Sequence, residues 1–406
     1  MSLTICLLHA VVFLDLLAIG SIVPLLPTYV RDLGGNQIHV GLLGSVYAGF
    51  QLASGPLLGN LSDLKGRKPV MIISLLISSL SYMCLGLTNS IYLILTIRAI
   101  LGIFKQTQML TRALVPDYER DQFKQAAIYG KMAAISGAGM TLGPVLGGHI
   151  TEENPEDGFL MITLIVGFCF AMNASIIYFL PASRTQLVKR KSHSHGQTNI
   201  ITTVYQSVCQ SFVELYHINW STYGDVFMFK ALISFAMGVY YSNYVSYLQI
   251  QYGLTPKYIG YVISFQSVIG AISSFFIVFI NRFYIHDKDY SIRNLHVFLL
   301  LCIALLGLIL SYNIWVYCFW LIPLAIGNAV GRLVTLEMVL KKSDGHAGTL
   351  IGASNSVRSL TGVVSPMVSG IIGEYVGATY PIYASLGSIT TGVLLSYRHK
   401  RKLKQD

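Results

Sequence analysis

The chain has 406 residues, of which 53% are hydrophobic and 11% are charged, whereas soluble domains carry about 25% charged residues. This composition excludes an ordinary soluble protein and indicates a chain that lies largely within a membrane. The net charge of +10 does not indicate a nucleic-acid partner, because the basic residues lie in short loops between apolar segments.

Twelve segments are apolar and long enough to span a bilayer, which takes about 20 residues each. We therefore expect an all-α membrane protein with twelve transmembrane helices in two six-helix halves. The expected parts are an N-terminal half (1–181), a cytoplasmic linker with an amphipathic helix (182–222), a C-terminal half (223–396) and a basic cytoplasmic tail (397–406). The expected spans are 3–29, 39–60, 70–88, 91–115, 125–150, 159–181, 223–249, 257–281, 294–312, 314–339, 347–373 and 376–396.

Lys and Arg gather on one side of these spans. If both termini are cytoplasmic, the inner loops and the tail hold nineteen of these residues and the outer loops hold two, Arg31 and Lys257. Because cytoplasmic loops carry an excess of Lys and Arg, the sequence predicts a multi-pass membrane protein with both termini in the cytoplasm.

The linker contains the basic run KRKSHSHGQT, and apolar residues follow it at helical spacing from Ile200 to Tyr216. We expect a solvated segment and then an amphipathic helix on the cytoplasmic leaflet. The two histidines of the run could bind a metal ion, but a solvated linker is favoured. The six cysteines show neither a CxxC pair nor metal-ligand spacing, so no metal and no cofactor are predicted.

Two spans carry charges at a depth where charge is costly. Asp15 lies about ten residues into the first span, near the bilayer midplane, where a carboxylate is functional by default and a salt bridge made for packing is the alternative. In the fourth span Arg98, Lys105 and Arg112 recur at a spacing of seven on one helix face. Lys105 lies within about a turn of the depth of Asp15, so the two could pair; alternatively, Lys105 contacts an anionic substrate or snorkels away.

The segment GNLSDLKGRK joins the second and third spans. Its glycines permit a tight turn, and Asp63 could bind the positive N-terminal end of the eleventh helix as a latch on a cytoplasmic gate. The alternative is a solvated turn whose bases only set the topology. The candidate gate residues are Gly59, Asp63, Gly66, Arg67 and Lys68.

The fifth span has the pattern G-x8-G-x3-GP-x2-GG. In lipid, small residues let helix backbones approach closely, and neighbouring helices compensate for the hydrogen bond that proline removes. The pattern therefore predicts a packing groove and a bend, the alternative being a packing face without a role in transport. Its residues are Gly130, Gly139, Gly143, Pro144, Gly147 and Gly148. The eleventh span repeats the pattern weakly, with Pro366 in the place of Pro144.

These patterns resemble the major facilitator superfamily. The fifth-span pattern resembles its antiporter motif, GNLSDLKGRK resembles its loop G-x-L-x-D-R-x-G-R-R with a departure at Leu64, and Arg98 with Gly102 resembles its fourth-helix motif R-x3-G. The first span, with Pro24 and Pro27, resembles drug-proton antiporters of the tetracycline-efflux type. The shorter segments GIFK, YYSN and GTLIG resemble one branch of the superfamily.

The resemblance implies the major facilitator fold and transport by alternating access, with helices 1, 4, 7 and 10 around the cavity. On the seventh span an aromatic and polar face could line the substrate path, although an aromatic belt at the membrane surface is an alternative for Tyr247. The predicted substrate or proton pathway is Asp15, Lys105, Arg98, Tyr240, Asn243, Tyr244 and Arg332.

The predicted function is proton-coupled antiport of a small organic solute by a monomer in a lipid bilayer. The sequence holds no GxxxxGK[ST] motif of a primary pump and no H-E-x-x-H or paired-carboxylate motif of an enzyme. The alternative from another class is a transporter-like membrane protein that senses a ligand or scaffolds partners without net transport. Solute flux that depends on Asp15 would favour transport, whereas ligand binding without flux would favour the sensor.

The charge distribution predicts the topology. Reporter tags at both termini and in the 182–222 linker should all report the cytoplasm, because Lys and Arg are retained on that side. Glycosylation of the Asn219 sequon in the unmodified protein would contradict this orientation.

Overall fold

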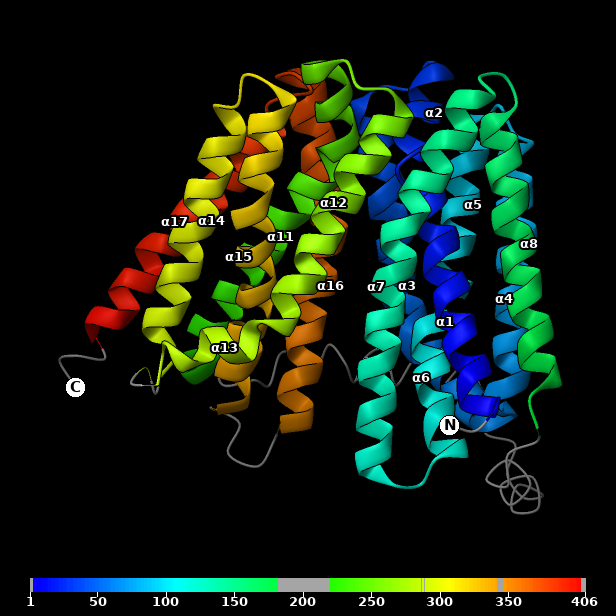
Figure 1. The fold of residues 1–406 in the computed structure, drawn as a ribbon, viewed down its shortest axis with the longest axis horizontal. Helices are drawn as coiled ribbons and strands as arrows, with labels where there is room; N and C mark the ends of the chain where they lie inside the picture. The colour runs from blue at the N-terminus through cyan, green and yellow to red at the C-terminus, as the bar shows by residue number, and fades with distance from the viewer. Residues whose placement is uncertain (1–2, 182–219, 286, 288, 342–346, 403–406) are drawn as a thin grey trace. The chain divides into compact units, whose positions relative to one another are not determined.

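The structure is a computed structural model that describes residues 3–181, 220–285, 287, 289–341 and 347–402. The amphipathic helix expected in the linker and the Asn219 sequon lie outside these residues. The described residues form fifteen α-helices, and three pairs of them are interrupted spans, which gives twelve spans (Figure 1). The predicted fold class, an all-α membrane protein with twelve spans, is confirmed.

The structure divides into two compact units. Unit 1 draws on Met1–Tyr29, Phe50–Ser211 and Thr255–Ser264, and unit 2 draws on Val30–Gly49, Phe212–Leu254 and Phe265–Asp406. In chain order the helices up to the linker are α1 (Leu3–Ile22), α2 (Leu26–Asp32), α3 (Gln37–Lys65), α4 (Arg67–Gly86), α5 (Ile91–Phe104), α6 (Thr107–Tyr118), α7 (Gln122–Glu153) and α8 (Gly158–Phe179). The helices after the linker are α11 (Trp220–Tyr252), α12 (Pro256–Phe275), α13 (Ile277–Arg282), α14 (Ser291–Ile309), α15 (Ile314–Lys341), α16 (Ala347–Tyr375) and α17 (Pro381–Lys402).

The first, fourth and eighth spans are interrupted, so the continuous helices expected over 3–29, 91–115 and 257–281 are wrong in this respect. Between α1 and α2 the cause is Pro24, which lacks an N–H group and whose ring clashes with the preceding turn. Between α5 and α6 no proline is present, and side chains of α3 satisfy the backbone groups that the interruption frees.

The turn between α3 and α4 is shorter than expected. α3 continues to Lys65 and α4 begins at Arg67, so that only Gly66 separates them. Gly66 has φ +97°, a conformation that residues with a side chain rarely adopt. Gly59 and Asp63 therefore lie in the last turns of α3, and the loop predicted around them is wrong.

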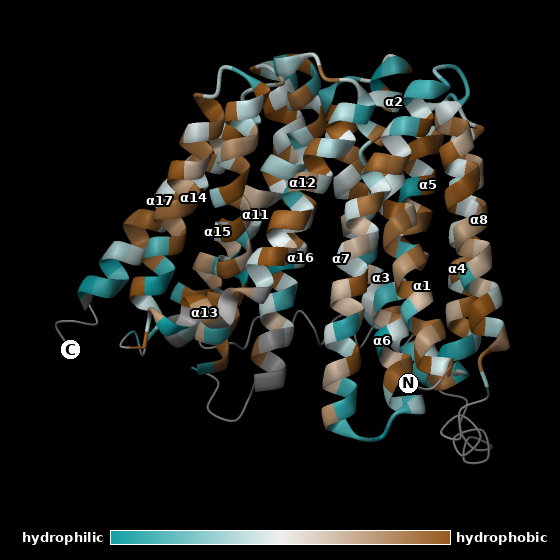
Figure 2. Cartoon of the chain, viewed as in Figure 1, coloured by the Kyte–Doolittle hydropathy of each residue, from teal (hydrophilic) through white to brown (hydrophobic). Residues whose placement is uncertain are grey.

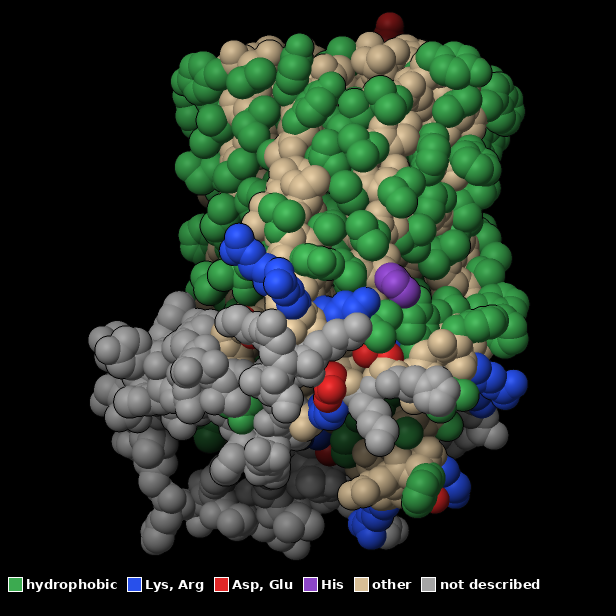
Figure 3. Space-filling view, turned by 90° about the vertical axis from the view of Figure 1, so that its left-hand side faces the viewer, with side chains coloured by type: hydrophobic (Ala, Val, Ile, Leu, Met, Phe, Trp, Pro, Cys, Tyr) green, Lys and Arg blue, Asp and Glu red, His purple; other side chains and the backbone are tan. Residues whose placement is uncertain are grey.

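The surface and the helix composition fit a membrane. By length and hydropathy, six helical segments of the described residues qualify as candidate spans: Leu3–Asp32, Arg67–Gly86, Ile91–Tyr118, Gly158–Phe179, Ser291–Ile309 and Ile314–Lys341. Hydrophobic residues fill the middle of the helices and hydrophilic residues gather near their ends (Figure 2). Figure 3 shows a broad hydrophobic face over the side of unit 2 that carries α14 and α17, with Lys and Arg gathered along its lower border.

In unit 1, the glycines of α7 bring its backbone against that of α1. A Cβ atom added at Gly139 would lie 2.8 Å from the Phe13 carbonyl oxygen, and one added at Gly143 would lie 2.6 Å from that of Leu17. A Cβ at Gly147 would overlap the Ser21 carbonyl. These three glycines recur every four residues on one face of α7, which is the close approach that small residues permit.

The rest of the α7 pattern packs differently. A Cβ at Gly148 would lie 2.6 Å from the carbonyl oxygen of Pro256, at the start of α12. One at Gly260 on α12 would overlap the carbonyl of Pro144. Gly130, in contrast, has open space around it.

Unit 2 repeats this packing around α16. A Cβ at Gly370 would lie 2.7 Å from the Gln37 carbonyl oxygen of α3, and one at Gly41 would overlap the carbonyl of Pro366. On the other side of α16, a Cβ at Gly238 of α11 would lie 2.5 Å from Ser365 Oγ. The weak sequence repeat between the fifth and eleventh spans thus corresponds to the same kind of helix contact in each unit.

The close contact of α7 with α1 predicts the effect of one substitution and its matched control. Gly143→Leu should strongly lower the thermal midpoint of the purified protein or prevent its recovery, because the side chain has no space beside the α1 backbone. Gly143→Ala should also destabilise, by about 1–3 kcal/mol, as overpacking does. The same Leu substitution at Gly130, on the same helix, should leave the midpoint unchanged or higher. Equal midpoints for the two Leu variants would contradict this packing.

Candidate functional site

An ion pair lies in the interior of unit 1. Lys105 Nζ donates to Asp15 Oδ1 at 2.6 Å, and the two side chains are 3% and 0% exposed. The pairing that the sequence left open is therefore present. The other carboxylate oxygen, Asp15 Oδ2, is buried without a hydrogen-bond partner among the described residues.

Lys105 occupies the interruption between α5 and α6. Its backbone has φ −78° and ψ 62°, and the N–H of Gln106 donates to the Phe104 carbonyl at 2.8 Å, which is the geometry of an inverse γ-turn. The continuous helix expected through Lys105 is therefore replaced by two helices whose ends meet beside Asp15.

Side chains from α3 satisfy the polar groups at this interruption. Ser54 Oγ donates to the Gly102 carbonyl at 3.2 Å, and Gln51 Nε2 donates to the Lys105 carbonyl at 3.3 Å. In return, Gln106 Nε2 donates to the Gln51 carbonyl at 3.0 Å and to Ser54 Oγ at 3.1 Å. Buried backbone groups need such partners, so these contacts hold an interruption that would otherwise be costly.

Phe170 of α8 lies beside the ion pair, and further polar side chains of α8 and α1 are buried in unit 1. Lys105 Nζ lies 5.0 Å from the centre of the Phe170 ring, within range of a cation–π interaction. Asn173 is fully buried, and its Nδ2 donates to the Val11 carbonyl of α1 at 3.2 Å. His9 is also buried, and neither ring nitrogen has a partner among the described residues.

Sequence reasoning missed Asn173 and His9 because each is a single polar residue in an apolar span. The interruption had a clearer signal, the run KQTQ from Lys105 to Gln108, in which four polar residues follow one another inside a span. Arg98, also predicted for the pathway, is 6% exposed on α5, and its role stays a prediction.

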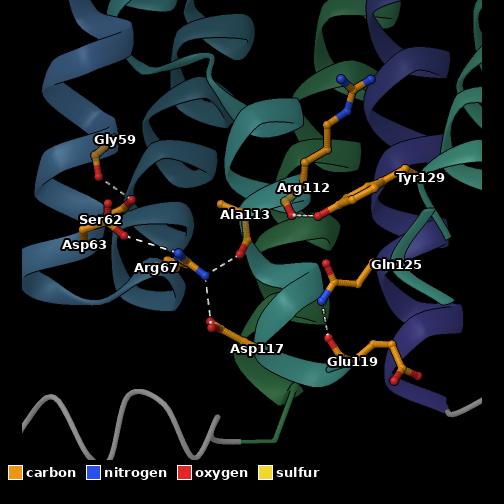
Figure 4. Close-up of polar contacts among 10 residues, drawn as sticks. All are labelled: Gly59, Ser62, Asp63, Arg67, Arg112, Ala113, Asp117, Glu119, Gln125 and Tyr129. Atoms are coloured by element: carbon orange, nitrogen blue, oxygen red, sulfur yellow. Dashed lines mark hydrogen bonds and ion pairs between the residues drawn. The ribbon is translucent and has the colours of Figure 1, made fainter. Parts of the chain in front are cut away.

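The candidate gate residues connect the end of α3 to α6 (Figure 4). Arg67 donates to the Ala113 carbonyl at 2.5 Å and to Asp117 Oδ1 at 3.0 Å, and it also pairs with Asp63 at 3.4 Å. Lys68 Nζ donates to the Leu180 carbonyl at 2.5 Å. The carboxylate of Asp63 thus pairs within unit 1, and its latch with the eleventh helix stays a prediction.

Two further contacts in Figure 4 connect α7 to α6. Gln125 Nε2 donates to the Glu119 carbonyl at 2.7 Å, and Tyr129 Oη donates to the Arg112 carbonyl at 3.3 Å. The Arg112 side chain is exposed. Hydrogen bonds from side chains to backbone carbonyls therefore join the ends of α4, α6 and α7, and the ion pair of Arg67 with Asp63 connects the end of α3 to them.

On α11 the predicted pathway residues lie in the packed interior of unit 2. Tyr240 and Tyr317 share a hydrogen bond of 2.9 Å between their hydroxyls, and Asn243 Nδ2 donates to the Ala378 carbonyl at 2.6 Å. Tyr244 is 4% exposed, and its ring lies 5.2 Å from that of Tyr240. The exposed tyrosine of this helix is Tyr241, at 44%, which sequence reasoning missed because it lies off the predicted face. Arg332 is exposed on α15.

The fold and the buried charges define a class of protein. Twelve spans with backbone-to-backbone glycine packing and an ion pair buried at an interrupted helix are features of a helical transporter in a membrane. The sequence profile of the Major Facilitator Superfamily matches residues 8–366. The chain belongs to this superfamily, whose members are integral membrane transporters rather than enzymes.

Curated relatives match the chain along its whole length. The chain is 24% identical over 412 residues to the quinolone resistance protein NorA of Staphylococcus aureus (strain MRSA252), with 100% of both chains covered. It is 23% identical over 414 residues to the class H tetracycline resistance protein of Pasteurella multocida, with 99% of this chain and 98% of the relative covered.

Solved structures share the fold. The human organic anion transporter MFSD10 (TETRAN) has a TM-score of 0.66 at 20% identity, covering 98% of this chain and 100% of that chain. A bacterial homolog of the human lysosomal transporter Spinster has a TM-score of 0.76 at 12% identity, covering 98% of this chain and 96% of that chain. At these identities the likeness concerns the fold alone.

The ion pair predicts a coupled effect on stability. Lys105→Ala should destabilise the protein by about 3–5 kcal/mol, because it leaves the Asp15 carboxylate buried without a partner. The double variant Asp15→Asn/Lys105→Ala should recover most of that loss, as measured from unfolding midpoints in detergent. Lys131→Ala, the same change at an exposed position of α7, is the control and should have little effect. Strictly additive losses would exclude an energetic coupling between the two residues.

Proposed function

We propose that the protein is a proton-coupled antiporter of a small organic solute, in which Asp15 and Lys105 form the proton-binding pair. The observation that carries the proposal is the buried ion pair at the interruption between α5 and α6. An ionisable pair within a membrane-spanning segment is costly, and this cost is a reason to assign it a function.

The geometry around the pair suggests how it exchanges a proton. Lys105 lies in a turn between two helices, so a change in its backbone angles would re-orient α6 against α5 and withdraw its side chain from Asp15. An isolated carboxylate in this apolar interior would then take up a proton, for which Asp15 Oδ2 is the buried oxygen without a partner. Return of Lys105 would release the proton, and alternating access would place uptake and release on opposite sides.

The resemblances support the solute class. The first span and the fifth-span motif resemble drug-proton antiporters of the tetracycline-efflux type, and the curated relatives are quinolone and tetracycline resistance proteins. The segments GIFK, YYSN and GTLIG place the chain, in this proposal, near major facilitator superfamily domain-containing protein 9.

We propose further that both termini face the cytoplasm and that the protein acts as a monomer. The excess of Lys and Arg in the loops on that side supports the orientation. In this orientation the contacts of Arg67 with Asp63, Ala113 and Asp117 lie at the cytoplasmic ends of the helices, where they would stiffen the N-terminal half during gating.

The proposal predicts flux that depends on Asp15. The protein reconstituted into liposomes that contain a pH-sensitive dye, screened over a panel of small organic solutes, should move protons when a transported solute is added. Asp15→Asn should abolish this proton movement, because the amide cannot bind the proton, while the protein remains in the membrane.

Asp157→Asn is the matched control for this experiment. Asp157 is exposed at the start of α8 and its side chain makes no capping hydrogen bond, so the same chemical change should leave flux unaltered. Solute-driven proton flux in Asp15→Asn equal to that of the parent would reject the pair as the proton site. Solute binding without any flux in the parent would favour the ligand sensor.

A further inference from the structure

Unit 2 contains three basic side chains at a similar depth on three helices that contact one another. Lys230 lies on α11, Arg332 on α15 and Arg358 on α16. Within the unit, α11 and α16 begin, and α15 ends, at the lower end in Figure 1. At a rise of 1.5 Å per residue, the three residues lie about 14 to 17 Å from these helix ends. They are therefore well inside the membrane-spanning part of the unit.

These residues, which we call the cation cluster, are close enough to interact. Lys230 Nζ donates to Ser354 Oγ, one helical turn before Arg358 on α16. Arg358 follows Ser354 on α16, which contacts both α11 and the α15 helix that carries Arg332. In the part of the chain that the structure describes, none of the three forms an ion pair with a carboxylate.

Packing does not account for the cation cluster. Arg332 and Arg358 are exposed and Lys230 is half-buried, so the three groups fill no core position. Like charges repel, and a cation at this depth is costly unless it faces water or a counter-ion. The nearby carboxylate of Glu337 pairs with Arg293 at 3.4 Å. An anion supplied from outside the chain would remove the repulsion.

A neutral hydrogen-bond donor lies next to the cation cluster. The Tyr241 hydroxyl accepts from Gln266 Nε2 at 3.3 Å and, at 3.2 Å, from Nδ2 of Asn328, which lies one turn before Arg332 on α15. Because its oxygen accepts two hydrogen bonds, its own proton is directed elsewhere. The side chain contacts α12 and α15 and is 44% exposed, so it is open to a ligand.

We infer that the cation cluster and the Tyr241 hydroxyl bind an organic anion that carries a carboxylate, sulfonate or phosphate group. Two guanidinium groups can each hold such a group through paired N–H donors, and the Lys230 ammonium adds a point charge. Three cations favour a solute with two negative charges over one with a single charge. The inference that this anion is the transported solute rests on the proposed function. The binding of the anion itself is tested without transport.

The test compares probes of matched shape and opposite charge. Equilibrium binding of radiolabelled benzenesulfonate, benzenedisulfonate and phenyltrimethylammonium is measured on the purified full-length protein in lipid-free nonionic detergent. The sulfonates should bind, the disulfonate more tightly, and the ammonium should not. Lys230→Gln, Arg332→Gln and Arg358→Gln should each weaken sulfonate binding about tenfold or more, as loss of a charge-assisted hydrogen bond does.

Lys341→Gln is the control for loss of positive charge. Lys341 lies on α15 and forms a surface ion pair with Asp289, away from the cation cluster in the chain, so its variant should bind like the parent. Parent affinity in all three cluster variants, each with an unchanged elution profile and unfolding midpoint, would overturn the inference. Equal binding of the sulfonates and the ammonium would also overturn it.

A lipid headgroup is the other source of such an anion. Displacement of the sulfonate by short-chain phosphatidylglycerol, but not by short-chain phosphatidylcholine, would identify the cation cluster as a lipid site and overturn its assignment to a solute. The binding assay contains no proton gradient. Loss of anion binding therefore rejects the cation cluster, whereas loss of coupled flux with anion binding retained rejects the antiport proposal.

Discussion

Unit 1 depends on the backbone-to-backbone contact of α7 with α1. The contact exists because Gly139, Gly143 and Gly147 have no side chain on the face that meets α1. It brings α1 to a fixed position, and the hydrogen bond of Asn173 to the Val11 carbonyl holds α1 from the side of α8. Asp15 lies one turn beyond Val11, so these two helix contacts position its carboxylate for the ion pair with Lys105.

The same kind of contact positions the candidate site of unit 2. α16 has Pro366 and Gly370 against α3, and it has Ser365 against Gly238 of α11. About two to four turns before these positions α16 carries Ser354 and Arg358, and Lys230 of α11 donates to Ser354. In both units, therefore, a helix with small residues and one proline fixes the positions of its neighbours. This packing in turn determines where the charged groups lie.

The fold was predictable because it is encoded in long patterns. Twelve apolar stretches and the spacing of the α7 glycines suffice for the helices, the family and the region of close packing. The interruptions of the helices were harder to predict. Hydropathy reports whether a segment is apolar and not whether its series of helical hydrogen bonds is continuous. At Lys105 this series is replaced by bonds from Gln51 and Ser54, which are distant in sequence and carry no local signal.

The candidate sites, too, could be predicted from the sequence only in part. Depth along a span and the cost of a lone charge were enough to suggest that Asp15 and Lys105 could pair. Which side of α11 faces its neighbours could not be read from spacing, because tyrosines occupy both faces. Tyr240 and Tyr244 are packed in the interior, whereas Tyr241 is exposed and bonds to α12 and α15. That difference depends on the helices that surround α11.

The two proposed sites differ in net charge, and this difference has a consequence for energetics. The Asp15–Lys105 pair is neutral as an ion pair and becomes a cation when a proton binds, whereas the cation cluster carries three positive charges that a bound anion offsets in part. A cycle that combines both proposals moves a proton inward and an organic anion outward. Both steps carry charge in the same direction, and each elementary charge is worth about 2.3 kcal/mol per 100 mV. A membrane potential that is negative inside would therefore drive both steps, and the cations of unit 2 would be the groups that bind the exported anion.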